Sequence, residues 1–218
     1  MRIIIFTFFL ISLENTYCQT NNSTIKDIDG NVYHTVNIGT QIWTKENLQV
    51  IRYNDGKSIS NVIGAKYCWY NDSVKYKSIY GALYNWYVVN SGKLCPVGWH
   101  VPTDEDWKIL EMYLGMSQTE VDKTGTRGEN QGDKLKSTKG WWGNWNGTDN
   151  YGFCALPSGM HDLYGGKFYD AGYYGYWWSN TSAIDKKYAW TRFLYARNYI
   201  NRDNHYKENG YSVRCLKD

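Results

Sequence analysis

The sequence feature that most constrains the fold of this chain is a surplus of amphipathic aromatic residues. Its 218 residues include 11 Trp and 21 Tyr but 6 Phe. From residue 19 onward, 34 aromatic residues outnumber the 32 Leu, Ile and Val residues. Tyr and Trp bury a large apolar body and keep a polar atom that needs a partner, which suits thin cores, interfaces and ligand grooves. We therefore expect a loop-rich domain with little aliphatic core.

Bulk composition excludes several classes of protein. A mean hydropathy of −0.62 with 21% charged residues excludes a polytopic membrane protein, and the aromatic content excludes a disordered chain. The 24 basic and 21 acidic residues leave a net charge of +3. Because the Lys and Arg residues are scattered singly, they form no basic run, and no nucleic-acid partner is expected.

The N-terminus has the pattern of a secretory signal peptide. Arg2 is followed by an apolar run, residues 3–13, and small residues precede Gln19. The pattern predicts a signal peptide over residues 1–18, and the run is too short to be a transmembrane segment. Residues 19–27 are polar and are expected to form a short tether. The chain is thus predicted to be exported to the periplasm, the cell surface or the medium; in an alternative interpretation Cys18 is a lipid-anchored first residue.

Export changes how the remaining cysteines are interpreted. Cys68, Cys95, Cys154 and Cys215 are an even number in an oxidising compartment, so disulfides are expected. No pair has C-x-x-C spacing and no His stands at ligand spacing from a Cys, which argues against zinc. Four cysteines allow three connectivities, and spacing does not choose among them.

Alternating segments predict strands at both ends of the chain. Residues 32–38 and 41–46 alternate with a period of two around Gly39-Thr40, which predicts a β-hairpin. Residues 188–194 and 211–216 alternate in the same way and predict two further strands.

Two helices are predicted in the first half. Four residues at helical spacing share one face and predict a helix that ends near Ser91-Gly92: Ile79, Ala82, Leu83 and Trp86. A second helix is predicted from the N-cap Thr103 to Gly115, with acidic residues 104–106 in the first turn, where the helix dipole favours anions. From Gly125 onward short strands between long loops are expected, so residues 28–218 are predicted to form one α+β domain.

Six blocks of the sequence form a pattern in a fixed order. They are Asp29 to Gly39, Tyr80 to Trp86, Cys95 to Pro102, Gly147 to Pro157, Gly175 to Ser179 and Gly210 to Cys215. In this order they resemble the Fibrobacter succinogenes major paralogous domain family, over roughly the whole of residues 28–218. That family is similar to the C-type-lectin-like fold, which it shares with the formylglycine-generating enzyme group. The resemblance implies a C-type-lectin-like domain with two helices early and short twisted antiparallel strands between long Gly- and Trp-rich loops.

The resemblance also implies a disulfide. The cysteine of the Cys-Pro-x-Gly-Trp block and the cysteine near the C-terminus both recur in the family, which implies that Cys95 pairs with Cys215. Cys68 and Cys154 are left for a second pair, although they depart from the commoner family pattern.

A Trp-rich loop supplies the candidate ligand residues. Trp141, Trp142 and Trp145 stand beside Asn146 and Asp149. Aromatic faces next to amide and carboxylate groups can hold a sugar ring by stacking and directed hydrogen bonds. Residues 176–179 belong to the shared family pattern and are expected to fill the core instead.

The sequence gives less support for a metal site or a catalytic site. The Glu-Pro-Asn, Gln-Pro-Asp and Trp-Asn-Asp motifs of calcium-dependent lectins do not occur. Asn146, Asp149 and Asn150 are candidate calcium ligands, but such residues are also what tight turns need; no other cofactor is expected. No histidine accompanies a nucleophile elbow, and no catalytic residues are assigned.

The sequence therefore predicts an exported, non-catalytic binding module for a glycan or another surface ligand. Two alternatives stay open. One is a glycan-active hydrolase or a degenerate relative of the formylglycine-generating enzymes. The other is a structural module that contacts a surface protein. The oligomeric state is not predicted.

Overall fold

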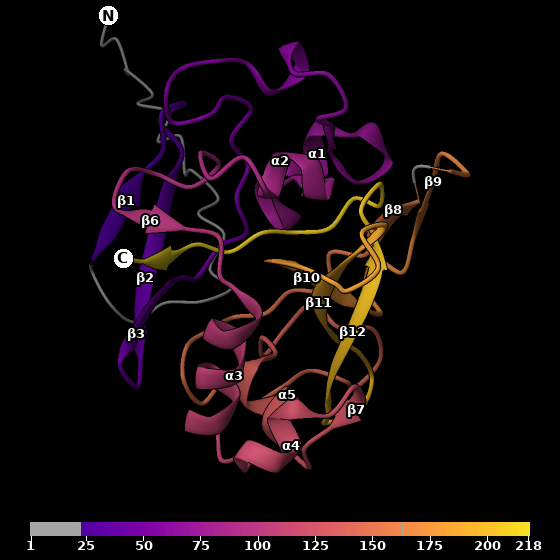
Figure 1. The fold of residues 1–218 in the computed structure, drawn as a ribbon. Coiled ribbons are helices and arrows are strands. Elements are labelled where there is room, and N and C mark those ends of the chain that lie inside the picture. Colours follow the sequence, from indigo (N-terminus) through magenta and orange to yellow (C-terminus); the bar gives the residue numbers. More distant parts are fainter. Residues whose placement is uncertain (1–22, 163) are drawn as a thin grey trace, which may run out of the picture.

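Two antiparallel sheets form the framework of the computed structural model, which describes residues 23–162 and 164–218 (Figure 1). The first sheet has the order β1-β2-β3-β13-β6 and the second the order β10-β11-β12-β7. The first sheet consists of β1 (Thr24–Lys26), β2 (Val32–Ile38), β3 (Gln41–Thr44), β13 (Leu216–Lys217) and β6 (Trp99–His100). The second consists of β10 (Gly175–Ser182), β11 (Tyr188–Leu194), β12 (Ile200–Tyr206) and β7 (Gly125–Arg127).

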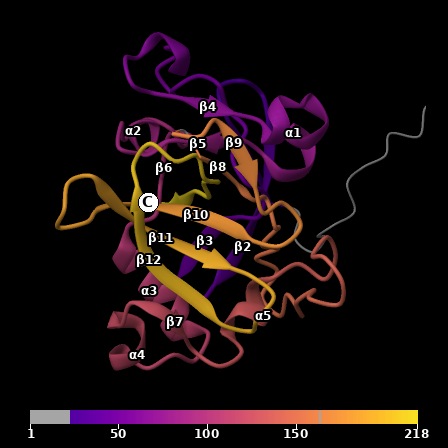
Figure 2. The same cartoon turned by 90° about the vertical axis from the view of Figure 1, so that its right-hand side faces the viewer.

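Two small two-stranded sheets, five α-helices and two 3₁₀ helices (Ile59–Asn61 and Tyr70–Asp72) complete the described part of the chain. One sheet pairs β4 (Tyr67–Cys68) with β5 (Leu83–Tyr84), and the other is the hairpin of β8 (Met160–Asp162) and β9 (Lys167–Tyr169). The helices are α1 (Val74–Tyr80), α2 (Trp86–Val89), α3 (Asp104–Tyr113), α4 (Gln118–Asp122) and α5 (Gln131–Leu135). Figure 2 shows α1 and α2 at one end of the molecule and α3, α4 and α5 toward the other. Among the described residues, no helix has the length and apolar character needed to cross a bilayer.

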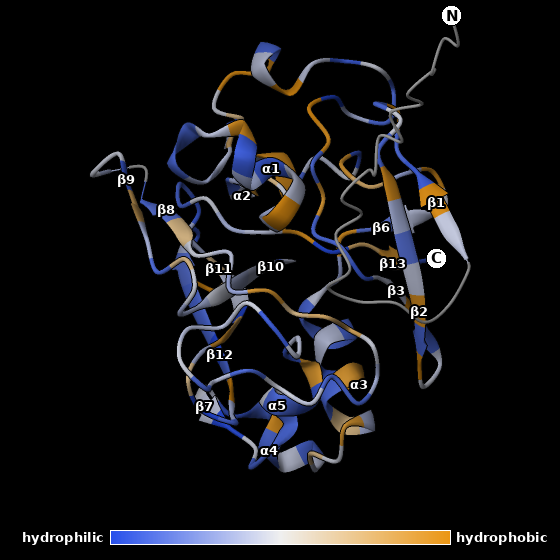
Figure 3. Ribbon diagram, turned by 180° about the vertical axis from the view of Figure 1, so that it is seen from behind, coloured by the Kyte–Doolittle hydropathy of each residue, from blue (hydrophilic) through white to orange (hydrophobic). Residues whose placement is uncertain are grey.

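The predicted hairpin and α+β class are confirmed. Strands β2 and β3 pair through Ile38 and Gln41, and Gly39 makes the turn with a φ of 62°. Figure 3 shows polar and apolar residues mixed along β2, as expected for a strand with one buried face. Strand β11 also has its predicted bounds, whereas β12 was not predicted, because its charged and amide residues hide the alternation.

The helix predicted from Ile79 toward Ser91 is wrong. Helix α1 ends at Tyr80, and Gly81 follows with a φ of 73°. A Cβ at Gly81 would lie 2.7 Å from the Leu48 carbonyl oxygen, and the Ala82 N–H donates to that same oxygen at 2.7 Å. Because this segment pairs with a distant part of the chain, the helix expected from the local periodicity does not continue, and β5 begins at Leu83.

Two other expectations about the chain termini change. Residues 24–26, expected within a polar tether, form β1 and pair with residues 32–34 of β2. The predicted strand at residues 211–216 is a true strand only from Leu216, since Tyr211 and Ser212 make isolated bridges to other segments. The predicted signal peptide over residues 1–18 and the lipid anchor at Cys18 lie outside the described residues.

The expected N-cap of α3 is confirmed as a capping box. The Thr103 hydroxyl accepts from the Asp106 N–H at 3.1 Å, and an Asp106 carboxylate oxygen accepts from the Thr103 N–H at 2.8 Å. Trp107 and Leu110 face the core, as predicted. Asp104 differs from its neighbours, because it is buried rather than solvated.

A buried ion network joins α3 to the second sheet. The Asp104 carboxylate accepts from Arg192 Nη1 at 2.7 Å and from Arg202 Nη2 at 2.6 Å. The Glu111 carboxylate accepts from Arg127 Nη2 at 2.7 Å and from Arg192 Nε at 2.6 Å. The three arginines come from β7, β11 and β12, so one helix face of carboxylates orients the helix on three strands.

A disulfide ties the C-terminal segment to the loop before β6. Cys95 and Cys215 are bonded, as the family resemblance implied. Cys68 is a free thiol, so the second pair of Cys68 with Cys154 is wrong. The reason is tertiary: Cys68 lies in the small two-stranded sheet of β4 and β5, where its thiol is 3.9 Å from the Leu83 carbonyl oxygen.

The core is built largely from aromatic rings, as the composition indicates. The Trp43 ring lies 4.9 Å from Trp107 and 5.6 Å from Phe153, centroid to centroid. Trp177 and Trp178 are 1% and 0% exposed, which confirms that these residues of β10 pack in the core. Their indole N–H groups donate to Asn47 Oδ1 and to the Tyr84 carbonyl oxygen, so burial leaves no indole donor of this pair unsatisfied.

Removing the disulfide is expected to destabilise the fold strongly. The bond closes a loop of 120 residues, and the chain-entropy estimate for such a loop is about 5 kcal/mol. The double variant Cys95→Ala, Cys215→Ala should lower the free energy of unfolding by an amount of that order, measured by urea denaturation. Cys68→Ser is the matched control, and a double variant as stable as that control would contradict the prediction.

Replacing Asp104 is expected to change both stability and its dependence on pH. Burial alone would raise the pKa of Asp104, but hydrogen bonds and charges from Arg202 and Arg192 outweigh it and hold the pKa below 3.8. This stabilisation is therefore complete at neutral pH and is lost as the pH falls below the ordinary carboxyl value. Asp104→Asn should lower the free energy of unfolding at pH 7 by about 3 kcal/mol.

The same variant should lose less stability than the wild type between pH 5 and pH 2, in urea titrations at each pH. Glu105→Gln, one residue along and exposed, is the control and should leave both quantities nearly unchanged. An Asp104→Asn variant with wild-type stability at pH 7 would show that the network does not hold α3.

Candidate functional site

The structure divides the three predicted ligand tryptophans into two groups. Trp141 is 3% exposed, and its indole N–H lies 3.1 Å from both the Ser137 hydroxyl and the Ala155 carbonyl oxygen. It packs in the core cluster around Trp43 and Trp107. Trp141 is thus a core residue that holds the base of the loop, and its assignment as a ligand residue is not supported by its position.

Trp142 and Trp145 form an exposed cluster with a third ring, Tyr173. The three side chains are 57%, 37% and 38% exposed. The Trp142 and Tyr173 rings are stacked with centroids 5.1 Å apart and planes 26° apart, and Trp145 meets both rings edge-on. We call these three residues the aromatic platform.

The platform is held by a contact between two loops. The Trp142 N–H donates to the Gly172 carbonyl oxygen at 2.7 Å, which brings the loop after α5 against the loop before β10. Gly172 has a φ of 86°, a conformation that glycine adopts without strain. Tyr173 was not among the ligand residues predicted from the sequence, because its exposure depends on this contact between two loops. The turn-forming Gly172 beside Tyr173 and Tyr174 was the one sequence feature that pointed to an exposed tyrosine here.

The polar residues of the predicted loop serve the loop's own backbone. Asn146 Oδ1 accepts from the Trp141 N–H at 3.1 Å. Asp149 has a φ of 46°, and its Oδ1 accepts from the Cys154 N–H at 2.8 Å. These are the turn roles that Asn and Asp adopt by bonding nearby N–H groups.

The electrostatics around Asp149 oppose a bound cation. Burial raises the pKa of Asp149 to about 6, although the Cys154 N–H, Lys45 and Arg214 each favour the carboxylate. The positive charges of Lys45 and Arg214 already act on this carboxylate, and they would repel a calcium ion held by Asn146, Asp149 and Asn150. Within the described ranges, no group of three or more His, Cys, Asp or Glu side chains is arranged to hold a metal ion.

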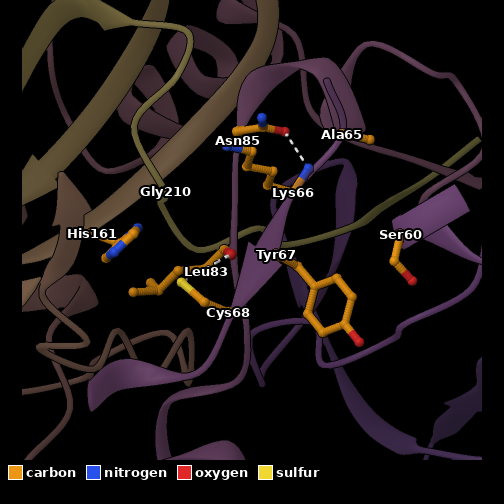
Figure 4. A pocket seen from close by; sticks show the side chains of 9 residues that line it. All are labelled: Ser60, Ala65, Lys66, Tyr67, Cys68, Leu83, Asn85, His161 and Gly210. Carbon is orange, nitrogen blue, oxygen red and sulfur yellow. Dashed lines mark hydrogen bonds between the residues drawn. The ribbon is translucent and has the colours of Figure 1, made fainter. Parts of the chain in front are cut away.

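A cavity of about 430 Å³ opens beside β4 and β5, next to the segments that carry His161 and Gly210 (Figure 4). Nine residues line it: Ser60, Ala65, Lys66, Tyr67, Cys68, Leu83, Asn85, His161 and Gly210. Its volume lies in the range of roughly 300 to 1,000 Å³ typical of small-molecule sites. The lining mixes apolar surface with a few polar groups from four separate segments.

The thiol and the imidazole of this cavity are both neutral at physiological pH. Burial, with a smaller contribution from Asp72, raises the pKa of the Cys68 thiol to about 12. Burial also lowers the pKa of His161 below 6.5. A cysteine nucleophile needs a thiolate stabilised by a nearby cation, and this environment disfavours both charged forms. The arrangement is suited to binding by neutral groups.

The family of the chain follows from a comparison with family models. Residues 36–217 match the model described as the Fibrobacter succinogenes major domain. The match spans nearly all of the described chain, so the protein belongs to this family. No match was found among curated proteins or among solved structures.

The Cys68 thiol is expected to react slowly in the folded protein. With a pKa of about 12 in place of 9.0, almost none of it is thiolate at pH 8. Alkylation of Cys68 by iodoacetamide at pH 8 should be at least about 100-fold slower in buffer than in 8 M urea, followed by mass spectrometry of the Cys68 peptide. Equal rates in the two conditions would show that the thiol is not in the protected environment described.

Proposed function

We propose that this chain is a non-catalytic glycan-binding module and that the aromatic platform of Trp142, Trp145 and Tyr173 is its contact surface. The observation that carries the proposal is the exposure of three mutually packed aromatic rings on one surface. Large side chains of this kind are normally buried, and exposed clusters mark sites of interaction. Packing of the rings against each other supplies a rigid surface before any ligand binds.

Sugar rings suit such a platform chemically. A pyranose presents a face of C–H groups that stacks on an aromatic ring, and hydroxyl groups at its edge that need directed hydrogen bonds. Asn144 and Asn146 are exposed in the same loop as Trp142 and Trp145. Their amides can donate to and accept from hydroxyl groups at the edge of a stacked sugar.

We further infer that the domain has a C-type-lectin-like architecture and works outside the cytoplasm. The C-terminal strand lies between β3 and β6 in the first sheet, and the disulfide joins it to the segment before β6. These features support the lectin-like architecture, in which both ends of the domain lie in one sheet and the long loops form the contact surface. The disulfide supports an oxidising location, and the apolar run of residues 3–13 supports export by a signal peptide.

The enzymatic alternative has less support. Asp149, the carboxylate that a hydrolase at the Trp-rich loop would need, bonds the Cys154 N–H. Cys68 and His161 share a cavity but are kept neutral by burial. A binding role requires none of these groups to be activated.

Truncating the platform is expected to weaken glycan binding without unfolding the protein. Trp142→Ala and Trp145→Ala should each weaken binding at least tenfold, or by about 1.4 kcal/mol, because each removes a stacking face. The measurement is a glycan-array screen, with and without a calcium chelator, followed by calorimetric titration of the tightest glycan found. Unchanged binding with the chelator is expected.

Two control variants separate the platform from general effects. Tyr113→Ala removes a 53% exposed tyrosine at the end of α3 and should leave binding unchanged. Trp141→Ala should lower the free energy of unfolding by about 3 to 5 kcal/mol, as expected for a buried Trp. A blank array in both conditions would overturn the glycan proposal and leave a protein partner as the remaining role of the platform.

A further inference from the structure

A second cavity adjoins the one beside β4 and β5. It has a volume of about 220 Å³ and is lined by Gly64, Lys66, Asn85, Tyr87, Tyr164 and Glu208. Lys66 and Asn85 line both cavities, so the two are adjacent parts of one depression. We call this depression the Lys66–Asn85 groove. Its residues are separate from those of the aromatic platform.

The floor of the groove is rigidly built. Asn85 is 2% exposed, its Oδ1 accepts from the Lys66 N–H at 3.0 Å, and its Nδ2 donates to the Gly64 carbonyl oxygen at 2.7 Å. Opposite, the His161 N–H donates to the Gly210 carbonyl oxygen and the Gly210 N–H donates back to the His161 carbonyl oxygen. Figure 4 shows His161 and the Lys66–Asn85 pair on different ribbons around the same space.

Each end of the groove contains a polar atom without a partner. His161 Nδ1 and Glu208 Oε2 are both buried and make no hydrogen bond to any described residue. The other Glu208 oxygen accepts from the Tyr87 hydroxyl at 2.9 Å, so the carboxylate is held in place while Oε2 stays unused. An unpaired buried polar atom destabilises the protein, and a ligand that supplies a hydrogen-bond partner would remove that cost.

The charges of the groove select against most classes of ligand. Lys66 at the junction disfavours a cation, and Glu208 disfavours an anion. A purely apolar ligand would leave Glu208 Oε2 and His161 Nδ1 unsatisfied. A neutral polyhydroxyl compound meets every requirement, because each hydroxyl group both donates and accepts hydrogen bonds.

The aromatic lining favours a ring-shaped ligand of that class. Tyr67 lines the larger cavity, and Tyr87 and Tyr164 line the smaller one. Tyr164 is 72% exposed and lies between β8 and β9, so its ring is accessible to a ligand in the smaller cavity. Tyrosine rings stack on sugar faces while their hydroxyl groups remain available for hydrogen bonds.

We propose that the Lys66–Asn85 groove is a second saccharide site, which binds a neutral sugar. Glu208 Oε2 accepts from one of its hydroxyl groups, and His161 Nδ1 accepts from or donates to another, according to the imidazole tautomer. The class of ligand rests on the proposed glycan-binding function, but the site stands on different residues. A module with two such sites binds a multivalent glycan surface more tightly than either site alone.

The test is an NMR titration of the full chain. The probe is the tightest neutral glycan on the array, or glucose if the array is blank. Resonances of His161 and Tyr164 should shift on titration. Tyr164→Ala and Glu208→Gln should each weaken that response at least tenfold, and the introduced amide keeps an oxygen that can accept from Tyr87. The matched control is Tyr169→Ala, which removes another exposed tyrosine of the same hairpin from outside the groove.

The outcomes separate the two proposals. A groove response that survives Trp142→Ala with Trp145→Ala and is lost in the groove variants supports the second site, whatever the platform does. Binding lost in the tryptophan variants, with no shift at His161 or Tyr164, overturns the groove and leaves the platform standing. A groove response, together with tryptophan variants that bind the array glycan as tightly as the wild type, supports the groove and overturns the platform. A blank array together with no shift from any neutral probe overturns both.

Discussion

The rest of the structure depends on the hydrogen bonds made by the guanidinium group of Arg214. It is fully buried and donates to Asn47 Oδ1 at 2.7 Å, to the carbonyl oxygens of Thr44 and Phe153 at 2.8 Å, and to that of Cys154 at 2.9 Å. Burial lowers the pKa of Arg214 to about 10, which still leaves the group charged at neutral pH. A buried charge needs partners on every side, so this one cation holds the segment before β13, the end of β3 and the loop beyond α5 in one arrangement.

The same logic recurs where α3 meets the second sheet. Asp104 and Glu111 are buried carboxylates matched by three arginines from separate strands. Such networks orient elements because any other arrangement leaves a charge without a partner. This chain has few aliphatic side chains in its core. Its packing is specified instead by buried ion pairs and by the hydrogen bonds of buried Tyr and Trp side chains.

The aromatic surplus is thereby divided between packing and surface. Trp177 and Trp178 each combine burial with a satisfied indole N–H, so they serve the core. Trp142, Trp145 and Tyr173 are left exposed by the loops around them. Long loops build both the aromatic platform and the Lys66–Asn85 groove. The loop-rich, aromatic composition of the chain therefore also supplies the two surfaces that we propose for ligand binding.

Local patterns in the sequence determined the β2–β3 hairpin, the capped helix α3 and the resemblance to the family. The resemblance alone implied the disulfide of Cys95 with Cys215. Local patterns could determine these features because turn chemistry, capping and short periodic runs act between residues close in sequence. The apparent helix through Gly81 failed because pairing with Leu48 overrides local periodicity. Only the tertiary structure decided that Trp141 is buried while Trp142 is exposed, and that two cavities meet at Lys66, because burial depends on which distant segment covers a side chain.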